Sequence, residues 1–383
     1  GIQVPVQRTE DGLRGLVTTP PCGRISLTPQ TEEAWKSDSE AKAVHADPVP
    51  VSARRSDSEI VLENEWIRAV ISDRGEVLSF VDRETQREYA AGPMNRLLLY
   101  KDVPRMFDAW DIDSNYILQP VPLDEPVSVS ITESGGLRAV LRVRRKVQHS
   151  DFEQDIILAA DSRRLDFVTR VDWHELHRLL KVEFPVDVQT SEGINEIQFG
   201  YMKRPTHRSR LYDSDRFEVC CQRYSALCDE SHGAAVLNDC KYGISMNGNA
   251  LQLTLLRAAA SPEMRADNGQ HSFTYAFTVW EGSFLESPVV REAYKLNVPL
   301  QTAPGLCSGV DSGVNAASGS AFSVDADNIF IDTVKPAEDG SGDIILRLYE
   351  AKHAQTRCRL TLSPDVLKAR TAKFFLCDLL ENP

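Results

Sequence analysis

Residues 127–148 read VSVSITESGGLRAVLRVRRKVQ, and apolar and polar side chains alternate on both sides of Gly135 and Gly136. An alternation with a period of two places one set of side chains on a single face of a β-strand. The two glycines provide the backbone freedom that a tight turn requires. The stretch therefore predicts an antiparallel hairpin, with strands over 127–132 and 137–147, that keeps one face in a hydrophobic core.

The same alternation continues along much of the chain. It begins near residue 59 with EIVLENEWIRAVIS, and Asp73-Arg74-Gly75 marks a turn into the next alternating run. Further strands are predicted at 165–173, 234–237, 251–256, 272–280, 329–334, 344–349 and 357–362. Helical periodicity is nearly absent. Because each apolar sheet face must be covered by another sheet, the fold class is all-β, a large antiparallel β-sandwich with smaller flanking β-modules.

Two polar stretches divide the chain. Residues 29–58 are rich in Pro, Ser and Asp, and residues 299–320 are rich in Gly, Ser and Ala. Both compositions are typical of linkers or solvated loops. We therefore predict an N-terminal β-segment with a polar linker at 1–58, a main β-sandwich at 59–298, and a linker with a small C-terminal β-module at 299–383.

Composition and charge exclude several classes of protein. Lys and Arg number 43 against 56 Asp and Glu, and the net charge of −13 opposes the attraction to phosphate that drives nucleic-acid binding. No run approaches the roughly 18 to 20 apolar residues of a membrane helix, and the first residues lack a secretion signal. The eight cysteines contain no CxxC pair. We expect reduced thiols in a cytoplasmic protein that binds neither nucleic acid nor membrane.

No common catalytic or metal-binding motif is present. The sequence lacks a GxSxG elbow, a P-loop and an HExxH helix. The nearest approach, His174-Glu175-Leu176-His177, would place its histidines on opposite faces of a strand and is better explained as a solvated strand end. A second group is crowded in sequence but fits no zinc template, namely Cys220, Cys221, Cys228, Cys240 and His232. We predict no metal site in this chain.

The run FDAWDID, residues 107–113, combines two aromatic rings with three carboxylates. Aromatic plates contact the apolar faces of a sugar ring, and carboxylates accept hydrogen bonds from its hydroxyls. The run therefore predicts substrate-binding roles for Asp108, Trp110 and Asp111. The alternative is structural, because Asp also forms turns through local hydrogen bonds and a buried Trp often anchors a loop.

The segment EIQFGYMKRPTHRS, residues 196–209, gathers several cations at a bend where Pro205 ends a predicted strand. Arg204 and His207 could reach a sugar hydroxyl or an acidic neighbour, and loops of this kind often carry function. We predict both as substrate-binding residues. The alternative is that these cations form surface ion pairs of little energetic value with acidic residues downstream, namely Asp213, Asp215 and Glu218.

Together with these two runs, three further stretches carry a family resemblance: RFEVCCQRYSALCDESHGAAVLNDCKYG at 216–243, LLRAAASPEMRADNGQHSFTYAF at 255–277 and LRLYEAKH at 346–353. The chain closely resembles the C-terminal half of glycoside hydrolase family 38 α-mannosidases, and their cytosolic class in particular. The resemblance covers most of residues 59–383. It implies that the large sandwich is a galactose-mutarotase-like supersandwich.

The resemblance also implies where the chemistry of the whole protein resides. In this family the zinc ion, its His and Asp ligands and the Asp nucleophile belong to an N-terminal α/β domain. The present chain is thus expected to be the C-terminal, non-catalytic portion of a zinc-dependent retaining exo-α-mannosidase, with no catalytic residue and no zinc ligand of its own. Its expected partners are that N-terminal catalytic domain, a mannose-containing oligosaccharide and further copies of itself.

Two alternatives of other kinds stay open at this point. The chain could be a stand-alone carbohydrate-binding or scaffold module in which Trp110 and Tyr116 stack on glycans without chemistry. It could also be a self-contained hydrolase that uses an unrecognised pair of carboxylates, since sequence spacing alone does not reveal such a pair.

Overall fold

The computed structural model describes most of the chain, as two compact units. The described residues are Val4, 6–9, 12–20, 22–25, 51–56, 59–302, 319–363 and 373–382. The larger unit comprises residues 5–15 and 45–299, and the smaller comprises 1–4, 16–44 and 300–383. None of the helices in the described ranges is long and apolar enough to cross a membrane.

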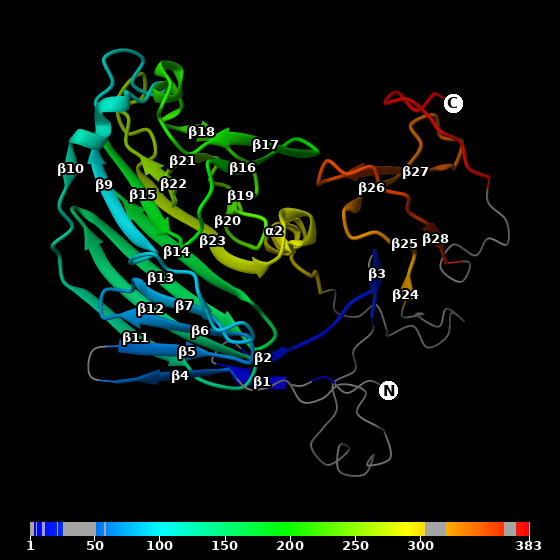
Figure 1. The fold of residues 1–383 in the computed structure, drawn as a ribbon, viewed down its shortest axis with the longest axis horizontal. Helices are drawn as coiled ribbons and strands as arrows, with labels where there is room; N and C mark the ends of the chain where they lie inside the picture. The colour runs from blue at the N-terminus through cyan, green and yellow to red at the C-terminus, as the bar shows by residue number, and fades with distance from the viewer. Residues whose placement is uncertain are drawn as a thin grey trace, which may run out of the picture. The chain divides into compact units, whose positions relative to one another are not determined.

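A nine-stranded antiparallel sheet forms one wall of the larger unit (Figure 1). Its order is β11-β12-β13-β14-β23-β20-β19-β16-β17. The strands are β11 (Val127–Glu133), β12 (Arg138–Val147), β13 (Ser150–Ala159), β14 (Arg164–Trp173), β16 (Glu192–Ile197), β17 (Gly200–Pro205), β19 (Tyr224–Cys228), β20 (His232–Asn238) and β23 (Gly269–Glu281).

Two further antiparallel sheets complete this unit. A six-stranded sheet has the order β10-β9-β15-β22-β21-β18, and a five-stranded sheet runs from β4 to β8. The six-stranded sheet contains β9 (Arg96–Lys101), β10 (Pro120–Val121), β15 (Arg178–Pro185), β18 (Val219–Cys220), β21 (Gly243–Asn247) and β22 (Ala250–Arg257). The five-stranded sheet contains β4 (Ser52–Arg55), β5 (Glu59–Glu63), β6 (Ile67–Ser72), β7 (Val77–Asp82) and β8 (Arg87–Glu88). The all-β fold is thereby confirmed.

The predicted hairpins form. β11 pairs with β12 from Val127↔Arg145 onward, and the intervening Gly135 and Gly136 have φ angles of 99° and 74°. Only glycine adopts such positive φ angles without steric cost, so this turn depends on both residues. The tight turn at Gly75, with φ of 79°, likewise joins β6 to β7.

Aromatic side chains from all three sheets meet in one core. Phe184 of β15 stacks on Phe277 of β23, with ring centroids 5.4 Å apart and planes at 7°. Phe80 of β7 meets the same Phe277 edge-on at 5.1 Å. These three rings are at most 1% exposed, and each buried ring contributes about 1.5–3 kcal/mol. The alternation in the sequence thus arises because one face of each strand packs into this shared core.

Two elements differ from the sequence-based expectation. β4 lies inside residues 29–58, which were expected to be a solvated linker, because Ala53 is buried and the strand pairs with β5. A short helix, α2 (Val289–Asn297), was not anticipated. Only Val289, Val290 and Ala293 of this helix are buried, so its apolar periodicity is too brief to recognise. The remaining short elements are β1 (Val6–Thr9), β2 (Gly12–Gly15), η1 (Ser114–Leu118), η2 (Leu211–Arg216) and η3 (Phe284–Glu286).

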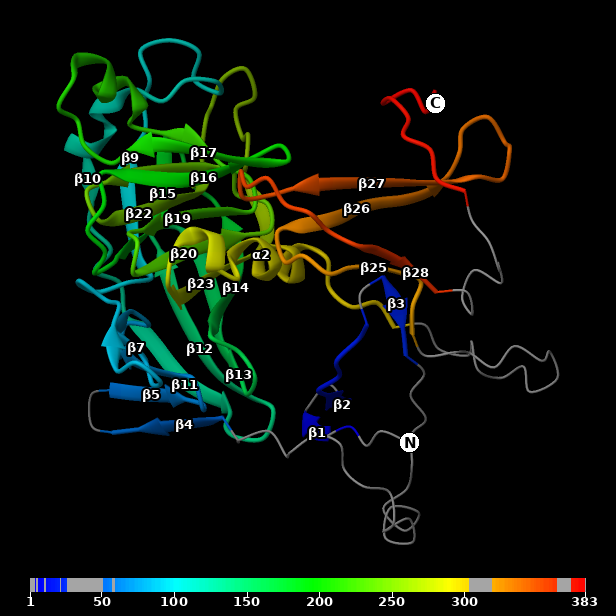
Figure 2. The same ribbon diagram turned by 45° about the vertical axis from the view of Figure 1, so that its right-hand side comes forward.

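The smaller unit consists of paired strands, of which β26 (Ile329–Pro336) and β27 (Ile344–Glu350) form a long ribbon (Figure 2). Its other strands are β3 (Gly23–Arg24), β24 (Gly319–Ser320), β25 (Phe322–Val324) and β28 (Leu360–Leu362). The strands predicted at 329–334 and 344–349 are confirmed, and the one predicted at 357–362 is shorter. Most of the linker predicted at 299–320 lies outside the described residues, and the three-part division at 58 and 298 stays a prediction.

Candidate functional site

The run FDAWDID lies in a loop between β9 and β10, which we call the aromatic loop and define as residues 102–113. Its turn is closed by the backbone N–H groups of Trp110 and Asp111, which donate to the Phe107 carbonyl over 2.8 and 2.9 Å. Phe107 takes a left-handed conformation with φ of 55°. The side chains of Phe107 and Trp110 are 58% and 74% exposed. The loop therefore presents two aromatic rings to its surroundings, and the alternative of a buried anchoring Trp is wrong.

Arg257, the last residue of β22, holds this loop on the sheet. Its Nε donates to Asp102 Oδ2 over 2.7 Å, and its Nη2 donates to the carbonyls of Asp108 and Asp111 over 3.1 and 2.7 Å. The guanidinium is suited to this because its donors form a rigid planar fork. Burial raises the pKa of Asp102 above its ordinary value even though the Arg257 charge opposes the shift. Sequence reasoning missed Arg257: the stretch 255–277 was noted only for its family resemblance, and nothing in it marks this arginine as a contact of the loop.

The Asp108 carboxylate stabilises the loop and is only partly free to accept hydrogen bonds from a ligand. Its Oδ2 accepts hydrogen bonds from the backbone N–H groups of Ala260 and Ser261, over 2.7 and 3.2 Å. Its Oδ1 lies 3.6 Å from His177 Nδ1, and neither atom has a hydrogen-bond partner among the described residues. Asp111, in contrast, is exposed and uses only its backbone here. Of the three predicted loop residues, Trp110 and Asp111 are therefore the ones free to contact a ligand.

The two histidines of the 174–177 segment are in a turn between β14 and β15. His174 is exposed and its Nε2 lies 2.9 Å from Asp172 Oδ1, as a solvated strand end would predict. His177 instead points toward Asp108 from a left-handed backbone position, with φ of 51°. Its N–H donates to the Ala258 carbonyl and its carbonyl accepts from Asp102. His177 thus helps to join the aromatic loop to the neighbouring strand ends.

Arg204 and His207 belong to a different part of the unit. β17 ends at Pro205, as predicted, and Arg204 Nη1 donates to Asn195 Oδ1 over 2.7 Å. His207 Nδ1 lies 2.8 Å from Ser209 Oγ and 3.6 Å from the carboxylate of Asp213, so the predicted acidic neighbour is present. Among the described residues, no hydrogen bond or ion pair links Arg204 or His207 to the aromatic loop.

The aromatic loop and the segment around His207 lie at opposite ends of strand β22. Arg257 contacts the aromatic loop at the end of β22, whereas His207 shares a surface hollow with Asn247 and Gly248, which precede β22. The eight residues of β22 span roughly 25 Å at about 3.3 Å per residue. The structure therefore does not bring the five predicted substrate-binding residues into one site. In Figures 1 and 2 the β9–β10 and β22–β23 connections lie together at one end of the larger unit.

A buried ion pair lies on the six-stranded sheet near the aromatic loop. The Lys181 ammonium is fully buried and bonds to the Glu218 carboxylate, which also accepts a hydrogen bond from Thr254. Lys181 Nζ is 5.7 Å from the centre of the Tyr116 ring. Burial lowers the pKa of Lys181, and Glu218 opposes that shift. Burial also raises the pKa of Tyr116 to about 12. The pair fastens the segment that precedes β18 to the sheet.

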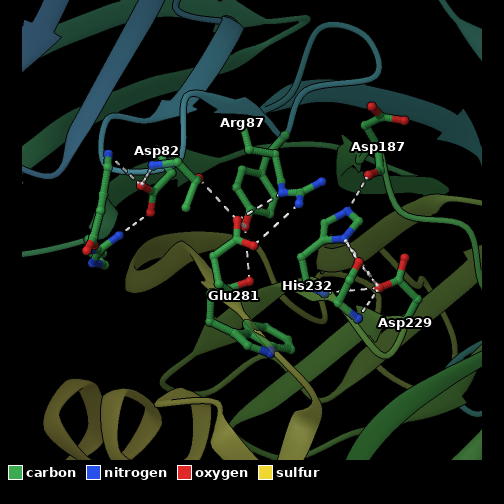
Figure 3. A network of polar contacts seen from close by, with 12 residues as sticks. Asp82, Arg87, Asp187, Asp229, His232 and Glu281 are labelled. Atoms are coloured by element: carbon green, nitrogen blue, oxygen red, sulfur yellow. Dashed lines mark hydrogen bonds and ion pairs between the residues drawn. The ribbon is translucent and has the colours of Figure 1, made fainter.

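A second polar cluster joins β8, β20 and β23 (Figure 3). The Glu281 carboxylate accepts hydrogen bonds from Arg87 Nε over 2.9 Å and from the Tyr89 hydroxyl over 3.0 Å. His232 is held at Nε2 by the Asp187 carbonyl at 3.0 Å and at Nδ1 by the Ser231 hydroxyl at 2.8 Å. Because both ring nitrogens of His232 have hydrogen-bond partners, its role is structural. They link the five-stranded sheet to the nine-stranded one.

We expect the Glu281→Gln variant to change how stability depends on pH. Burial acts to raise the pKa of Glu281, but hydrogen bonds from Arg87 and Tyr89 outweigh it and hold the pKa below the ordinary 4.5. Such a carboxylate stabilises the fold above that value and loses its contribution as the pH falls through the lowered pKa. Urea unfolding should therefore show a less stable variant at neutral pH and a smaller loss on acidification below 4.5. Parallel pH profiles of the two proteins would contradict this role.

Metal ligands and reactive thiols are not indicated in the described part of the chain. No group of three or more His, Cys, Asp or Glu side chains there could hold a metal ion. The described cysteines are free thiols, and Cys307 lies outside the described residues. Burial raises the pKa of Cys221 to about 12 and those of Cys228 and Cys240 to about 11. These three thiols therefore remain protonated and poorly nucleophilic at neutral pH.

The three packed antiparallel sheets define an all-β sandwich protein. The chain belongs to glycoside hydrolase family 38. Residues 62–265 match the family described as "Glycosyl hydrolases family 38 C-terminal domain". Residues 328–383 match the "Glycosyl hydrolases family 38 C-terminal beta sandwich domain". The aromatic loop and the hollow beside His207 both fall within the first match.

Several relatives are named α-mannosidases. The chain is 38% identical over 376 residues to Alpha-mannosidase 2C1 of Homo sapiens, covering 96% of the chain and 34% of that protein. It is 31% identical over 360 residues to Alpha-mannosidase G of Dictyostelium discoideum, covering 90% of the chain and 32% of that protein. The chain thus spans about a third of the length of these relatives.

Solved structures agree with the fold. An α-mannosidase from Enterococcus faecalis superposes with a TM-score of 0.66 at 15% identity, covering 84% of this chain and 39% of that one. A family 38 protein from the same organism gives a TM-score of 0.65 over 84% of this chain and 41% of that one. At this level of identity the likeness concerns the fold alone.

Proposed function

We propose that this chain is the C-terminal, non-catalytic portion of a zinc-dependent retaining exo-α-mannosidase that hydrolyses terminal α-mannose from oligosaccharides. In this proposal the β-sandwich supports an N-terminal catalytic domain, and the aromatic loop lines the substrate cleft. The observation that carries the proposal is the family 38 match over residues 62–265, together with relatives that are named α-mannosidases.

The aromatic loop supports the second half of this proposal. Trp110 offers an exposed ring that can stack on the apolar face of a sugar, and Asp111 offers an exposed carboxylate beside it. Arg257 and Asp108 fix the loop backbone through hydrogen bonds, so the ring and the carboxylate are held in place before a ligand arrives. A preorganised contact of this kind binds at a smaller entropic cost. Asp108 acts here as a positioning residue.

Catalysis itself is proposed to lie outside this chain. Retaining glycosidases use a carboxylate nucleophile and a carboxylic acid that flank the scissile bond, and we assign neither role to a residue of this chain. The described residues contain no group suited to holding zinc, so we assign no zinc ligand to it either. Zinc, the nucleophile and the acid belong to the proposed catalytic domain.

The proposal extends to partners and compartment. We propose that the chain contacts the catalytic domain of the same protein and a mannose-containing oligosaccharide, and that the whole protein assembles with copies of itself. We also propose that it works in the cytoplasm, which the free thiols and the 38% identity to Alpha-mannosidase 2C1 support. Arg204 and His207 remain proposed ligand contacts separate from the aromatic loop.

The test is kinetic and uses the full-length protein. We expect the Trp110→Ala variant to lose about tenfold in kcat/KM for a mannose oligosaccharide, since aromatic contacts with a ligand are worth on the order of 1 kcal/mol or more. The melting temperature should not change, because Trp110 is 74% exposed. Leu211→Ala removes an apolar side chain that is 92% exposed on η2 and serves as the matched control.

Other outcomes would favour other functions. Unchanged kinetics of Trp110→Ala with altered assembly would favour a scaffold. Measurable glycan affinity of the 383-residue chain, with no effect of the loop on catalysis, would favour a carbohydrate-binding module. Hydrolysis of a chromogenic α-mannoside by the purified chain alone would contradict the non-catalytic role.

A further inference from the structure

A polar hollow lies on the larger unit at the end of β22 opposite Arg257. Its volume is about 600 Å³. Its lining comprises Gln189, Thr190, Ser191, Thr206, His207, Asn247 and Gly248. Every lining side chain except that of Gly248 ends in an amide, a hydroxyl or an imidazole, and no carboxylate, ammonium or guanidinium is among them. The lining thus offers hydrogen bonds and, apart from the imidazole of His207, no side chain that can carry a charge.

Backbone hydrogen bonds hold the walls of the hollow together. The Thr206 N–H donates to the Ser191 carbonyl over 3.0 Å, and the Thr206 hydroxyl donates to the Thr190 carbonyl over 3.0 Å. From the other side, the Gly248 N–H donates to the Thr206 carbonyl over 2.8 Å. Thr206 therefore ties three separate segments of the chain around one point. The hollow is a built feature of the fold and not a gap between independent loops.

Three groups of the lining have unused hydrogen-bonding capacity. The side-chain amides of Gln189 and Asn247 are exposed and have no hydrogen-bond partner among the described residues. His207 is held at Nδ1 by Ser209, at 2.8 Å, and lies 3.6 Å from the buried Asp213 carboxylate. Its Nε2 has no partner in the described part of the chain. Two amides and one imidazole nitrogen are thus available around the hollow.

Asp213 is itself anchored, so the ring of His207 has a fixed neighbour. Arg210 donates to the Asp213 carboxylate from both Nε and Nη2 over 3.0 Å, and Arg216 Nη1 donates over 3.3 Å. The backbone N–H of Ser209 donates to His207 Nδ1 over 3.4 Å, so the contacts at Nδ1 orient the imidazole and its other nitrogen lies on the opposite side of the ring. This arrangement gives the His207 ring contacts on one side even though its side chain is 43% exposed.

We propose that this hollow is a binding site for a neutral, hydroxyl-rich ligand, a part of a mannose-containing oligosaccharide distinct from the part at the aromatic loop. Amides donate and accept hydrogen bonds, as sugar hydroxyls do, so Gln189, Asn247 and His207 Nε2 match such a ligand group by group. The absence of charge in the lining favours a neutral ligand over a phosphorylated or carboxylated one. The choice of mannose rests on the function proposed above.

The test follows the amide signals of the hollow in the 383-residue chain. With asparagine and glutamine side chains labelled with ¹⁵N, addition of α-mannotriose should shift the signals of Gln189 and Asn247 along one saturation curve. In the Asn247→Ala variant the Gln189 signal should report a dissociation constant about tenfold higher, which corresponds to about 1.4 kcal/mol. The Asn268→Ala variant is the matched control and should leave that constant unchanged, since Asn268 is an exposed asparagine that does not line the hollow.

The outcomes separate this inference from the function proposed above. The site would be overturned if the Gln189 and Asn247 signals do not shift at mannotriose concentrations well above about 1 mM while the rest of the spectrum shows a folded protein. Equal shifts with glycerol would also overturn it, because a selective sugar site distinguishes the two. If the signals shift as expected but Trp110→Ala has normal kinetics in the full-length protein, the hollow stands and the role of the aromatic loop fails.

Discussion

Replacing Arg257 with methionine is expected to lower the free energy of unfolding by about 3–5 kcal/mol, as removal of one partner of a buried ion pair generally does. The Arg257 side chain is only 16% exposed and Asp102 is buried. Methionine keeps the apolar stem but leaves the Asp102 carboxylate without its cation. It also leaves the carbonyls of Asp108 and Asp111 without their donor, so the aromatic loop should loosen.

Urea unfolding measures the stability loss, and hydrogen exchange of residues 102–113 reports the loosened loop. The loss should shrink as the pH falls toward 3.8, the ordinary pKa of an Asp side chain, because protonation removes the buried charge. Adding Asp102→Asn to Arg257→Met should recover part of the stability. Arg265→Met changes an exposed arginine in the next loop and is the matched control. Equal stability of Arg257→Met and Arg265→Met would refute the role of Arg257 as an anchor.

The second large effect is expected from Glu218→Gln. This substitution keeps an acceptor for Thr254 but removes the charge that faces the fully buried Lys181. A buried ammonium without its counter-charge is costly, and we expect a loss of about 3–5 kcal/mol at neutral pH. The segment from Arg208 to Glu218 should detach from the six-stranded sheet as a result. Hydrogen exchange of that segment would show the detachment.

The pH dependence of this variant has a definite sign. Burial lowers the pKa of Lys181 below its ordinary 10.5, and removal of the Glu218 charge lowers it further. The unfolded chain then binds more protons than the folded one, so stability should rise as the pH increases toward 10.5. Lys181→Met combined with Glu218→Gln should be markedly more stable than Glu218→Gln alone, since no unpaired charge remains. Two equally unstable variants would show that the loss comes from packing instead.

Much of the fold could be predicted from local pattern. The alternation in 127–148 and the glycines at 135 and 136 are sufficient for the β11–β12 hairpin, because both the strand period and the turn depend on nearby residues. α2 escaped prediction because its buried face comprises few residues. β4 escaped because its place in the sheet depends on pairing with β5, which its own polar composition does not reveal.

The candidate site residues also differ in how far they could be predicted from nearby sequence. The run FDAWDID predicts a ligand contact at Trp110 because its residue types suit a sugar, and the structure exposes that ring; the binding role stays a prediction. The role of Asp108 could not be predicted from the sequence, since its carboxylate accepts hydrogen bonds from Ala260 and Ser261, about 150 residues away. Arg257 was missed for the same reason.

The sequence by itself determined that this protein is built of antiparallel strands, that it is acidic, and which family 38 stretches it carries, since periodicity, charge and residue order are properties of the chain alone. Only the tertiary structure decided which predicted residues share a site, which carboxylates are occupied and where free hydrogen-bonding groups gather. The physical reason is that hydrogen bonds and burial depend on distance in space, and antiparallel sheets bring together residues that are far apart in sequence.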